Sequence, residues 1–382
     1  MKIAHLADLH LGKTLSHLSF IDEQISILNK IVHILEKEKI DVLLIAGDIY
    51  DRPIPSAEAT KLLSTFLGKL HKKNIKVIMI AGNHDSADRL EYVSNLVNEM
   101  ELYIRGNYEG KIEPITFEDE YGNVHFYPIP YIRPSMVNRY IDQEDEKVHS
   151  YDEAFMYLMN QLKINKKERN IVLSHQFVTG AQIDPNSSEE LIVGGLDEIS
   201  AKHFEIFDYT ALGHIHRPQK VQKETIRYAG TLLKYSFGEA NQTKTLPIIT
   251  LKEKGNIEIE YIPLEPKRDL IELKMEYKEL LKKEVIEQYK DHYLHIVLQD
   301  KDLIEDASRV LRIQYPYLLK LDYEHIFSSE IYNPITLEEK ETKTPFELFS
   351  EFSELRNGEK MSSEQESYLQ KVLEELEGGM ES

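Results

Sequence analysis

Apolar runs and amphipathic segments alternate over the first hundred positions of the 382-residue chain. The apolar runs at 2–7, 41–46 and 75–81 are short and end in turn residues, which is typical of buried strands. Between them, 22–38 carries apolar residues at helical spacing, and 56–72 has the pattern of a helix that begins with a serine cap. Strands joined by helices usually pair in parallel through right-handed crossovers. The pattern therefore predicts an α/β fold with a largely parallel sheet.

The pattern changes after residue 100. Short strands and turn residues fill 102–130, a helix is expected over 151–162, and buried strands over 170–174 and 207–212. The stretch 226–262 is mainly β. We therefore expect two sheets face to face with helices outside both, a four-layer αββα sandwich over residues 1–265.

The remaining chain divides into two smaller parts. Residues 266–335 alternate strand, helix, strand, helix and strand, which predicts a small α/β capping domain near the lower size limit for independent stability. Residues 344–382 carry two amphipathic helical patterns with Arg356-Asn357-Gly358 between them. Two such helices cannot bury a core alone, so we expect this helical tail to pack on another surface.

Polar residues that can bind metal ions follow several predicted strand ends, where α/β sheets usually bind ligands. The segments are Asp8-Leu9-His10, Gly47-Asp48, Gly82-Asn83-His84-Asp85, Ser174-His175 and Gly213-His214-Ile215-His216. Together they supply seven potential ligands: Asp8, His10, Asp48, Asn83, His175, His214 and His216. Seven ligands suffice for two cations about 3.5–4 Å apart, the arrangement that clamps a phosphate for in-line displacement. Each segment alone could be a solvated turn, a helix cap or a satisfied core histidine, but the ordered set favours a metal-dependent phosphoesterase.

The segment Gly82-Asn83-His84-Asp85 is the most specific of these. Its glycine allows a tight turn and Asn83 offers a carbonyl oxygen. His84 is then left for acid chemistry, with Asp85 able to orient it. We therefore predict His84 and Asp85 as catalytic residues.

Composition and charge narrow the class of protein. The chain has no cysteine, which excludes disulfides and thiolate metal sites. No apolar run approaches the roughly 18–20 residues that span a bilayer. His5 and Asp8 interrupt the N-terminus too early for a signal peptide. We therefore expect a cytoplasmic protein without a membrane partner. The net charge of −20 argues against binding nucleic acid. However, acidic residues gather in 345–382, and two divalent cations would add positive charge at the site.

The ordered motifs resemble those of the calcineurin-like metallophosphoesterase superfamily. The stretches 7–13, 47–51 and 211–219 are similar, more narrowly, to the SbcD family of nuclease subunits from bacterial SbcCD complexes. The stretches 228–231 and 234–239 are also similar to that family. The likeness extends more loosely to the tail, where 345–349 matches the segment with which that family grips its ATPase. The departures, Leu9 for a commoner Trp and Thr231 for a commoner Ser, affect no predicted ligand.

The resemblance implies how the ligands divide. One ion would be held by Asp8, His10, Asp48 and His216. The other would be held by Asp48, Asn83, His175 and His214, so that Asp48 bridges. Ligation by nitrogen and oxygen without sulfur suits Mn²⁺ among other divalent ions, and the family points the same way. His84 would then steady or protonate the leaving oxygen, with Asp85 supporting it.

The resemblance also implies a substrate and partners. The activity would be a 3'-5' exonuclease on double-stranded DNA and an endonuclease on single strands and hairpins, in DNA repair, recombination and replication. The partner would be an SMC-like ABC ATPase of the SbcC type, and this chain has no Gly-rich phosphate loop of its own. The capping domain would position DNA, the helices of 345–377 would dock on the ATPase, and helices near 86–99 would form a homodimer within a heterotetramer. Lys13, Arg52 and Arg89 lie near the motifs in sequence and are candidate DNA contacts, while each taken alone is more often a solvated surface charge.

Two alternatives stay open. The first is a calcineurin-like phosphodiesterase or protein phosphatase with a non-DNA substrate. Pro53, where Ser/Thr phosphatases usually continue with Gly, and Asp85 in place of Glu argue against it. The second is a non-catalytic scaffold of the same fold, which would be expected to have lost ligands.

Overall fold

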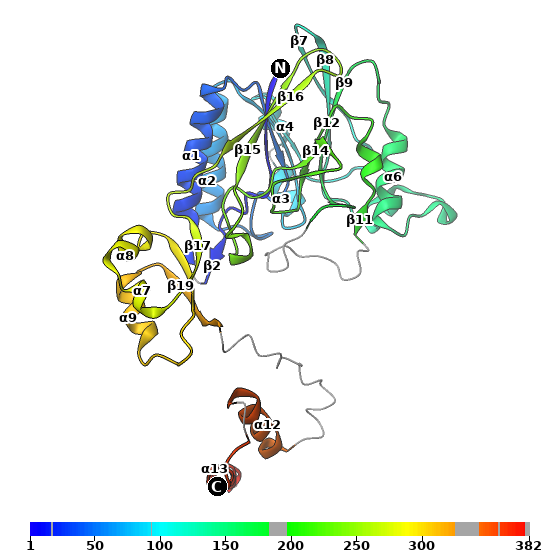
Figure 1. Ribbon diagram of the computed structural model, residues 1–382. Helices are drawn as coiled ribbons and strands as arrows, with labels where there is room; N and C mark the ends of the chain where they lie inside the picture. Colours follow the sequence, from blue (N-terminus) through cyan, green and yellow to red (C-terminus); the bar gives the residue numbers. More distant parts are fainter. Residues whose placement is uncertain (17, 93, 183–196, 325–343, 358–359, 379–382) are drawn as a thin grey trace. The chain divides into compact units, whose positions relative to one another are not determined.

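The computed structural model describes residues 1–16, 18–92, 94–182, 197–324, 344–357 and 360–378 (Figure 1). They form two compact units, Met1–Glu272 and Leu273–Ser382. Our finer division into 1–265, 266–335 and 344–382 stays a prediction. Within the described residues, no helix has the length and apolar character that a membrane span requires.

The first unit contains two six-stranded sheets. The first sheet has the order β16-β15-β1-β4-β5-β6. Its strands are β1 (Lys2–Leu6), β4 (Val42–Ala46), β5 (Lys76–Ile80), β6 (Leu102–Arg105), β15 (Thr245–Leu251) and β16 (Ile257–Pro263). β1, β4, β5 and β6 run parallel, and β15 and β16 extend the sheet in antiparallel fashion. The parallel strands predicted from the apolar runs are thus confirmed.

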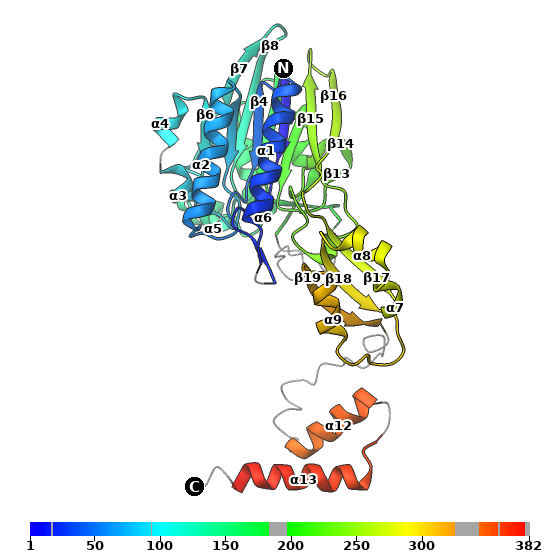
Figure 2. The same cartoon turned by 90° about the vertical axis from the view of Figure 1, so that its left-hand side faces the viewer.

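Two long helices cover the outer face of this sheet. Figure 2 shows α1 (Ile21–Lys37) and α2 (Ala57–Lys72) side by side in front of its strands. α2 begins as predicted, because the Ser56 hydroxyl accepts a hydrogen bond from the backbone N–H of Ala59 (3.1 Å). α1 turns its apolar stripe, which includes Leu28 and Ile31, toward the interior.

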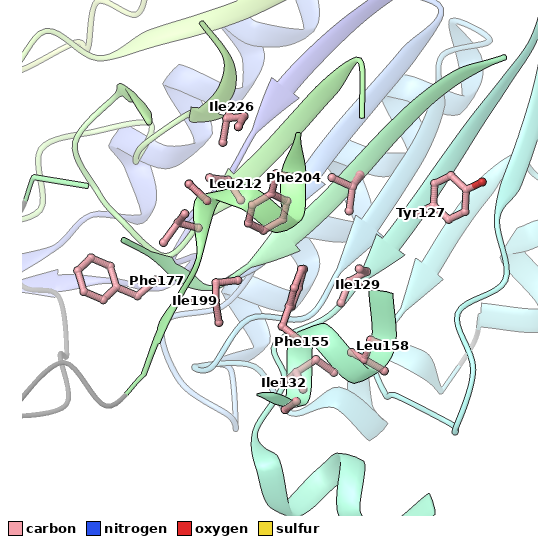
Figure 3. Close-up of a cluster of buried hydrophobic side chains, with 14 of the residues drawn as sticks. Tyr127, Ile129, Ile132, Phe155, Leu158, Phe177, Ile199, Phe204, Leu212 and Ile226 are labelled. Carbon is pink, nitrogen blue, oxygen red and sulfur yellow. The ribbon is translucent and has the colours of Figure 1, made fainter. Parts of the chain in front are cut away.

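The second sheet has the order β13-β14-β12-β9-β8-β7. Its strands are β7 (Ile115–Asp119), β8 (Gly122–Ile129), β9 (Arg169–His175), β12 (Tyr209–Gly213), β13 (Gln219–Val221) and β14 (Lys223–Tyr228). The four central strands are parallel. α6 (Tyr151–Gln161) packs on the outer face, where Phe155 and Leu158 meet Ile129 and Leu212 in the cluster of Figure 3.

A second apolar cluster fills the space between the sheets. It joins Val42 and Ile78 of the first sheet to Phe126 and Leu173 of the second, and these four side chains are at most 1% exposed. The layers are therefore helix, sheet, sheet and helix, which confirms the four-layer αββα sandwich. Because this apolar cluster packs against both sheets, it fixes the strand ends of one sheet relative to those of the other.

Short elements complete the first unit. They are β2 (Thr14–Leu15), β3 (Leu18–Ser19), α3 (Ala87–Glu91), α4 (Ser94–Asn98), α5 (Pro134–Val137), β10 (Phe177–Val178) and β11 (Glu198–Ile199), with 3-10 turns at Asn138–Tyr140, Glu144–Glu146, Ala201–Phe204 and Phe237–Glu239. α3 and α4 fall in the region for which we expected a dimer interface, and that interface stays a prediction.

The chain enters the second unit within β17 (Leu270–Met275), the first strand of a three-stranded sheet. The following elements are α7 (Tyr277–Leu280), α8 (Lys283–Tyr289), β18 (Tyr293–Leu298), α9 (Ala307–Gln314) and β19 (Leu318–Tyr323). The predicted strand–helix alternation is confirmed, except that two short helices, α7 and α8, take the place of its first helix. The helical tail is α12 (Pro345–Asn357) and α13 (Ser363–Gly378).

A partly buried ion cluster ties the N-terminus to the second sheet and gives a stability prediction. Asp119 accepts hydrogen bonds from the N-terminal ammonium (2.8 Å) and from Arg169 (3.0 Å), whose side chain is buried. Burial alone would raise the pKa of Asp119, but these two cations hold it well below its usual range. The ionised carboxylate therefore stabilises the fold above the ordinary carboxyl pKa, and this contribution is lost as the pH falls through the lowered value.

Replacing Asp119 by Asn should lower the free energy of unfolding by about 3 kcal/mol at pH 7, since a buried guanidinium loses its anionic partner. In urea unfolding, the difference in free energy of unfolding between the variant and the wild type should become smaller toward pH 3, because the wild type also begins to lose the interaction there. Glu118→Gln, an exposed neighbour on the same strand, is the matched control. Equal midpoints for Asp119→Asn and wild type at pH 7 would refute the assignment.

Candidate metal centre

The loops at the carboxyl ends of parallel strands bring the predicted ligands together. Asp8 follows β1 and Asp48 follows β4, and the loops are joined by a hydrogen bond from the backbone N–H of Asp8 to Gly47 O (3.0 Å). The second sheet contributes His175, the last residue of β9, and His214, directly after β12. Residues more than 200 positions apart therefore meet at one edge of the two sheets, as the strand-end rule predicts.

Four of these residues have unusual backbone conformations. Asp8, His10, Asp48 and His214 have φ angles of 50°, 43°, 48° and 103°. Each such conformation costs about 1–3 kcal/mol for a residue with a Cβ and persists only where the surroundings enforce it. Neighbouring glycines allow the close packing: a Cβ at Gly82 would collide with the carboxylate of Asp48. The strained backbone at these positions directs the four side chains toward one point.

The side chains form two groups that share Asp48. In the first, His10 Nε2 lies 3.1 Å from His216 Nε2 and 3.7 Å from Asp48 Oδ2, and Asp8 completes the group. In the second, His175 Nε2 lies 3.4 Å from the same Oδ2 atom.

The amide of Asn83 completes the second group. Its Oδ1 atom lies 3.0 Å from His175 Nε2 and 3.1 Å from His214 Nδ1. The structure thus brings together all seven predicted ligands. Asp8 lies close to members of both sets, since it also forms a group with Asp48 and His175. The role of these residues as ligands, and their division into two sets, remain our proposal.

Hydrogen bonds behind the rings fix which nitrogen faces the centre. His175 Nδ1 lies 2.8 Å from the carbonyl oxygen of Ala46, and His216 Nδ1 lies 3.4 Å from Glu239 Oε1. An Nδ1–H bonded to these oxygens leaves the Nε2 lone pair of each ring pointing into the centre. Metal-binding histidines are held in this way.

The donor set fits two divalent cations. Six of the seven residues are at most 6% exposed, and their inward atoms are imidazole nitrogens and carboxylate oxygens. The Nε2 atoms of two imidazoles, His10 and His216, lie 3.1 Å apart, so that both could bind one cation between them. Nitrogen and oxygen donors without sulfur suit Mn²⁺, Fe²⁺, Zn²⁺ and similar ions.

Charges within the centre agree with this fit. Burial would raise the pKa of Asp48, but the charge and hydrogen bond of His175 hold it well below its usual range. Burial would likewise lower the pKa of His175, but Asp48 and then Asp8 raise it to about 9. Protons thus compete with cations for His175, so metal affinity should fall as the pH is lowered.

His84 lies beside His10 and Asp48, close enough for the three side chains to form a group that could hold a metal ion. Its side chain is 19% exposed, and its Nδ1 lies 3.1 Å from the carbonyl oxygen of Asp51. Its Nε2 faces Asp48 Oδ2 at 4.0 Å. A ring held at one nitrogen, with the other directed toward the centre and solvent, can exchange a proton with a bound molecule.

Asp85 occupies a different position from the one we expected. Its carboxylate accepts hydrogen bonds from the backbone N–H groups of Gly82, Ile49 and Tyr50 at 2.9–3.0 Å. The carbonyl of Asp51, and not Asp85, is the hydrogen-bond partner of the His84 ring among the described residues. Because adjacent side chains diverge in a turn, Asp85 instead joins the loops after β4 and β5, and a catalytic role for it stays a prediction.

Sequence patterns missed a set of buried polar residues behind the ligands. Gln24, on the buried face of α1, donates to His10 O (2.7 Å) and to the Tyr235 hydroxyl (2.9 Å). Glu239 is fully buried and accepts from Lys244 Nζ (2.7 Å) and from the Thr231 hydroxyl (3.1 Å). A glutamine on the apolar stripe of a helix was the one available signal for Gln24.

Replacing Glu239 by Gln should weaken Mn²⁺ binding about 10- to 100-fold, since second-layer partners of this kind tune metal affinity. The variant keeps the shape of the side chain but loses the anion that holds His216 and pairs with Lys244. Mn²⁺ titration by calorimetry measures the change, and circular dichroism checks the fold. Glu224→Gln, an exposed ion-pair partner, is the control. Unchanged Mn²⁺ affinity in folded Glu239→Gln would contradict the role.

Comparison with known families bears on this centre. The model of the calcineurin-like phosphoesterase family matches residues 1–218, more than half of the chain, and this segment contains all seven predicted ligands. The chain belongs to the calcineurin-like phosphoesterase family. A second match covers residues 266–357 of the phosphoesterase and is to the SbcD C-terminal domain, described as the type 5 capsule protein repressor C-terminal domain. The two matches in one chain support an SbcD-type protein.

Solved structures give more distant similarities. A dimetal phosphatase from Danio rerio is 14% identical with a TM-score of 0.41, over 69% of this chain and 99% of that one. An archaeal phosphodiesterase is 12% identical with a TM-score of 0.31, over 69% and 100%. The calcineurin-like phosphoesterase YfkN from Bacillus subtilis is 14% identical with a TM-score of 0.38, over 69% and 90%. At these scores the assignment rests on the family models alone.

Proposed function

We propose that this phosphoesterase is the metal-dependent DNA nuclease subunit of an SbcCD-type complex. One observation carries the proposal: a centre in which two ligand groups share Asp48 lies in the same chain as a match to the SbcD C-terminal domain. The first feature supports hydrolysis of phosphate esters, and the second supports DNA as the substrate.

The residues of the centre suit phosphodiester hydrolysis. Bound divalent cations, for which we propose Mn²⁺, would activate water and neutralise charge on the phosphate. Asp48 would hold the two cations together, while Asp8 and the four histidines fix their positions. His84 would protonate the leaving oxygen from Nε2, since that atom alone of its ring faces the centre.

The remaining chain would supply the DNA-processing context. We propose that residues 266–335 help to position DNA and that α12 and α13 bind an SMC-like ABC ATPase of the SbcC type. The phosphoesterase would then act as a homodimer within a heterotetramer. A partner that binds DNA would also compensate for the net charge of −20, which opposes DNA binding by this chain alone.

A substrate panel tests this function. Hairpin, blunt-ended duplex and circular single-stranded DNA are compared with a cyclic nucleotide and a phosphopeptide, in Mn²⁺ or Mg²⁺, with and without the ATPase and ATP. We expect cleavage of the DNA substrates, with exonuclease products from the duplex and endonuclease products from the circle and the hairpin. Cleavage of only the nucleotide or the phosphopeptide would overturn the DNA assignment.

Deleting residues 345–382 should abolish co-purification with the co-expressed ATPase and leave hydrolysis of bis(p-nitrophenyl) phosphate within about twofold of wild type. The exposed α12 residue Phe349 gives a point test: Phe349→Glu should weaken ATPase binding, because a charge would enter an apolar contact. Met156→Glu, a similarly exposed apolar position on α6, is the control. ATPase binding that survives the deletion would refute docking through the tail.

A further inference from the structure

We propose that Tyr131 and Arg133 form a subsite that binds the phosphodiester backbone of the substrate strand beside the scissile phosphate. The subsite would take a nucleotide adjacent to the one cleaved, with the Arg133 guanidinium on its phosphate and the Tyr131 ring beside its base. This inference rests on the proposed nuclease function and deepens it.

The segment that carries both residues is fixed to both sheets. It directly follows β8, the neighbour of β9 in the second sheet. The backbone N–H of Tyr131 donates to Ala81 O (2.9 Å), at the end of β5 and two residues before Asn83. The buried side chain of Gln176 donates to Ile132 O (3.0 Å), next to His175. The segment is therefore part of the rim of the metal centre.

The Tyr131 ring forms a wall of that rim. It lies nearly parallel to the His214 ring (29°, centroids 6.3 Å apart) and edge-on to the His175 ring (79°, 6.2 Å). Its hydroxyl lies 3.4 Å from that of Tyr151, which anchors the far end of the ring. A tyrosine fixed in this way offers an aromatic surface next to the second ligand group, and unpaired bases stack on such surfaces.

Arg133 adds a positive charge at the same place. Its guanidinium lies 5.4 Å from the centroid of the Tyr131 ring, and the residue is exposed. In the described part of the chain, no carboxylate forms an ion pair with it. Two of the three candidates named from sequence, Lys13 and Arg52, differ in this respect, since their nitrogens lie 2.8 and 3.8 Å from Asp51 carboxylate oxygens.

This combination suits a phosphate more than other groups. A guanidinium binds phosphate oxygens through two parallel hydrogen bonds, whereas an ammonium acts as a point charge. The ring beneath it orients the guanidinium without neutralising it. In a chain of net charge −20, an arginine on the rim of a phosphoesterase centre that forms no ion pair within the described residues provides a specific attraction for an anionic strand.

Kinetics of three variants test the subsite. In Arg133→Ala, kcat/KM for a single-stranded oligonucleotide in Mn²⁺ should fall about 10- to 100-fold, as expected for losing charge-assisted hydrogen bonds. The loss should exceed that on bis(p-nitrophenyl) phosphate, which has no neighbouring nucleotide, by at least tenfold. Arg133→Lys should recover only part of the loss. Arg139→Ala, another exposed arginine nearby in sequence, should match wild type on both substrates.

Binding without cleavage gives an independent readout. In a His84→Ala background, fluorescence anisotropy over a salt series should show that Arg133→Ala lowers the slope of log Kd against log salt by about 0.7, the value for one phosphate contact on a single strand. Equal kinetics and equal salt slopes for Arg133→Ala and Arg139→Ala would overturn the subsite and leave the nuclease function standing. Failure of the wild type to cleave any DNA would overturn the nuclease function and the subsite with it.

Discussion

Replacing His84 with alanine should reduce DNA cleavage about 10²- to 10⁴-fold, the usual contribution of a positioned general acid, while two Mn²⁺ ions still bind. The reason is that His84 is not one of the seven predicted ligands, and its ring is held at Nδ1 by the carbonyl oxygen of Asp51 with Nε2 directed toward Asp48. The variant also keeps the backbone N–H of residue 84, which donates to Asp48 Oδ1 (2.9 Å). Single-turnover cleavage of an oligonucleotide, together with the Mn²⁺ content after gel filtration, measures the two effects separately.

His33→Ala, at an exposed position on α1, is the matched control and should behave as wild type. Loss of Mn²⁺ together with activity would make His84 a ligand. Cleavage at the wild-type rate would remove it from the reaction altogether.

Replacing Asp48 with asparagine should abolish cleavage and lower the Mn²⁺ content from two ions per chain to less than one. Asp48 is the residue that the two groups share, with its Oδ2 atom 3.7 Å from His10 Nε2 and 3.4 Å from His175 Nε2. Asparagine keeps the size of the side chain but removes one negative charge from both cations at once. Loss of only one of the two Mn²⁺ ions per chain would indicate that Asp48 binds a single cation.

Elemental analysis by mass spectrometry gives the Mn²⁺ content, and Asp88→Asn, at an exposed aspartate on α3, is the control. Two retained ions in Asp48→Asn would contradict the bridging role. Circular dichroism of the variant distinguishes loss of metal from loss of fold.

Much of this centre could be predicted because it depends on a general property of parallel sheets. Short apolar strands were visible as runs such as Val42–Ala46, and each ligand lies at the end of such a strand or at most four residues beyond it. The carboxyl ends of parallel strands in one sheet share one edge, so Asp8 and Asp48 of the first sheet had to be near one another, and so had His175 and His214 of the second. Which of these ligands lie close enough to form a group depends on how the two sheets pack, and this could not be predicted from the sequence.

Other parts could not be predicted because they depend on contacts between distant residues or on side-chain direction. Gln24 and Tyr235 are hydrogen-bonded across 211 positions of sequence, which no local pattern indicates. Adjacency suggested that Asp85 supports His84, but in the turn the two side chains diverge and Asp85 binds backbone N–H groups. Similarly, 277–289 has continuous helical spacing, yet the helix ends after Leu280 and a new one begins at Lys283.

Anomalous X-ray diffraction from a crystal of the wild-type chain soaked in Mn²⁺ would show directly whether the centre holds two cations that share Asp48. We expect two manganese peaks. One is surrounded by Asp8, His10, Asp48 and His216, and the other by Asp48, Asn83, His175 and His214. A single peak, or two peaks that do not share Asp48, would contradict this expectation.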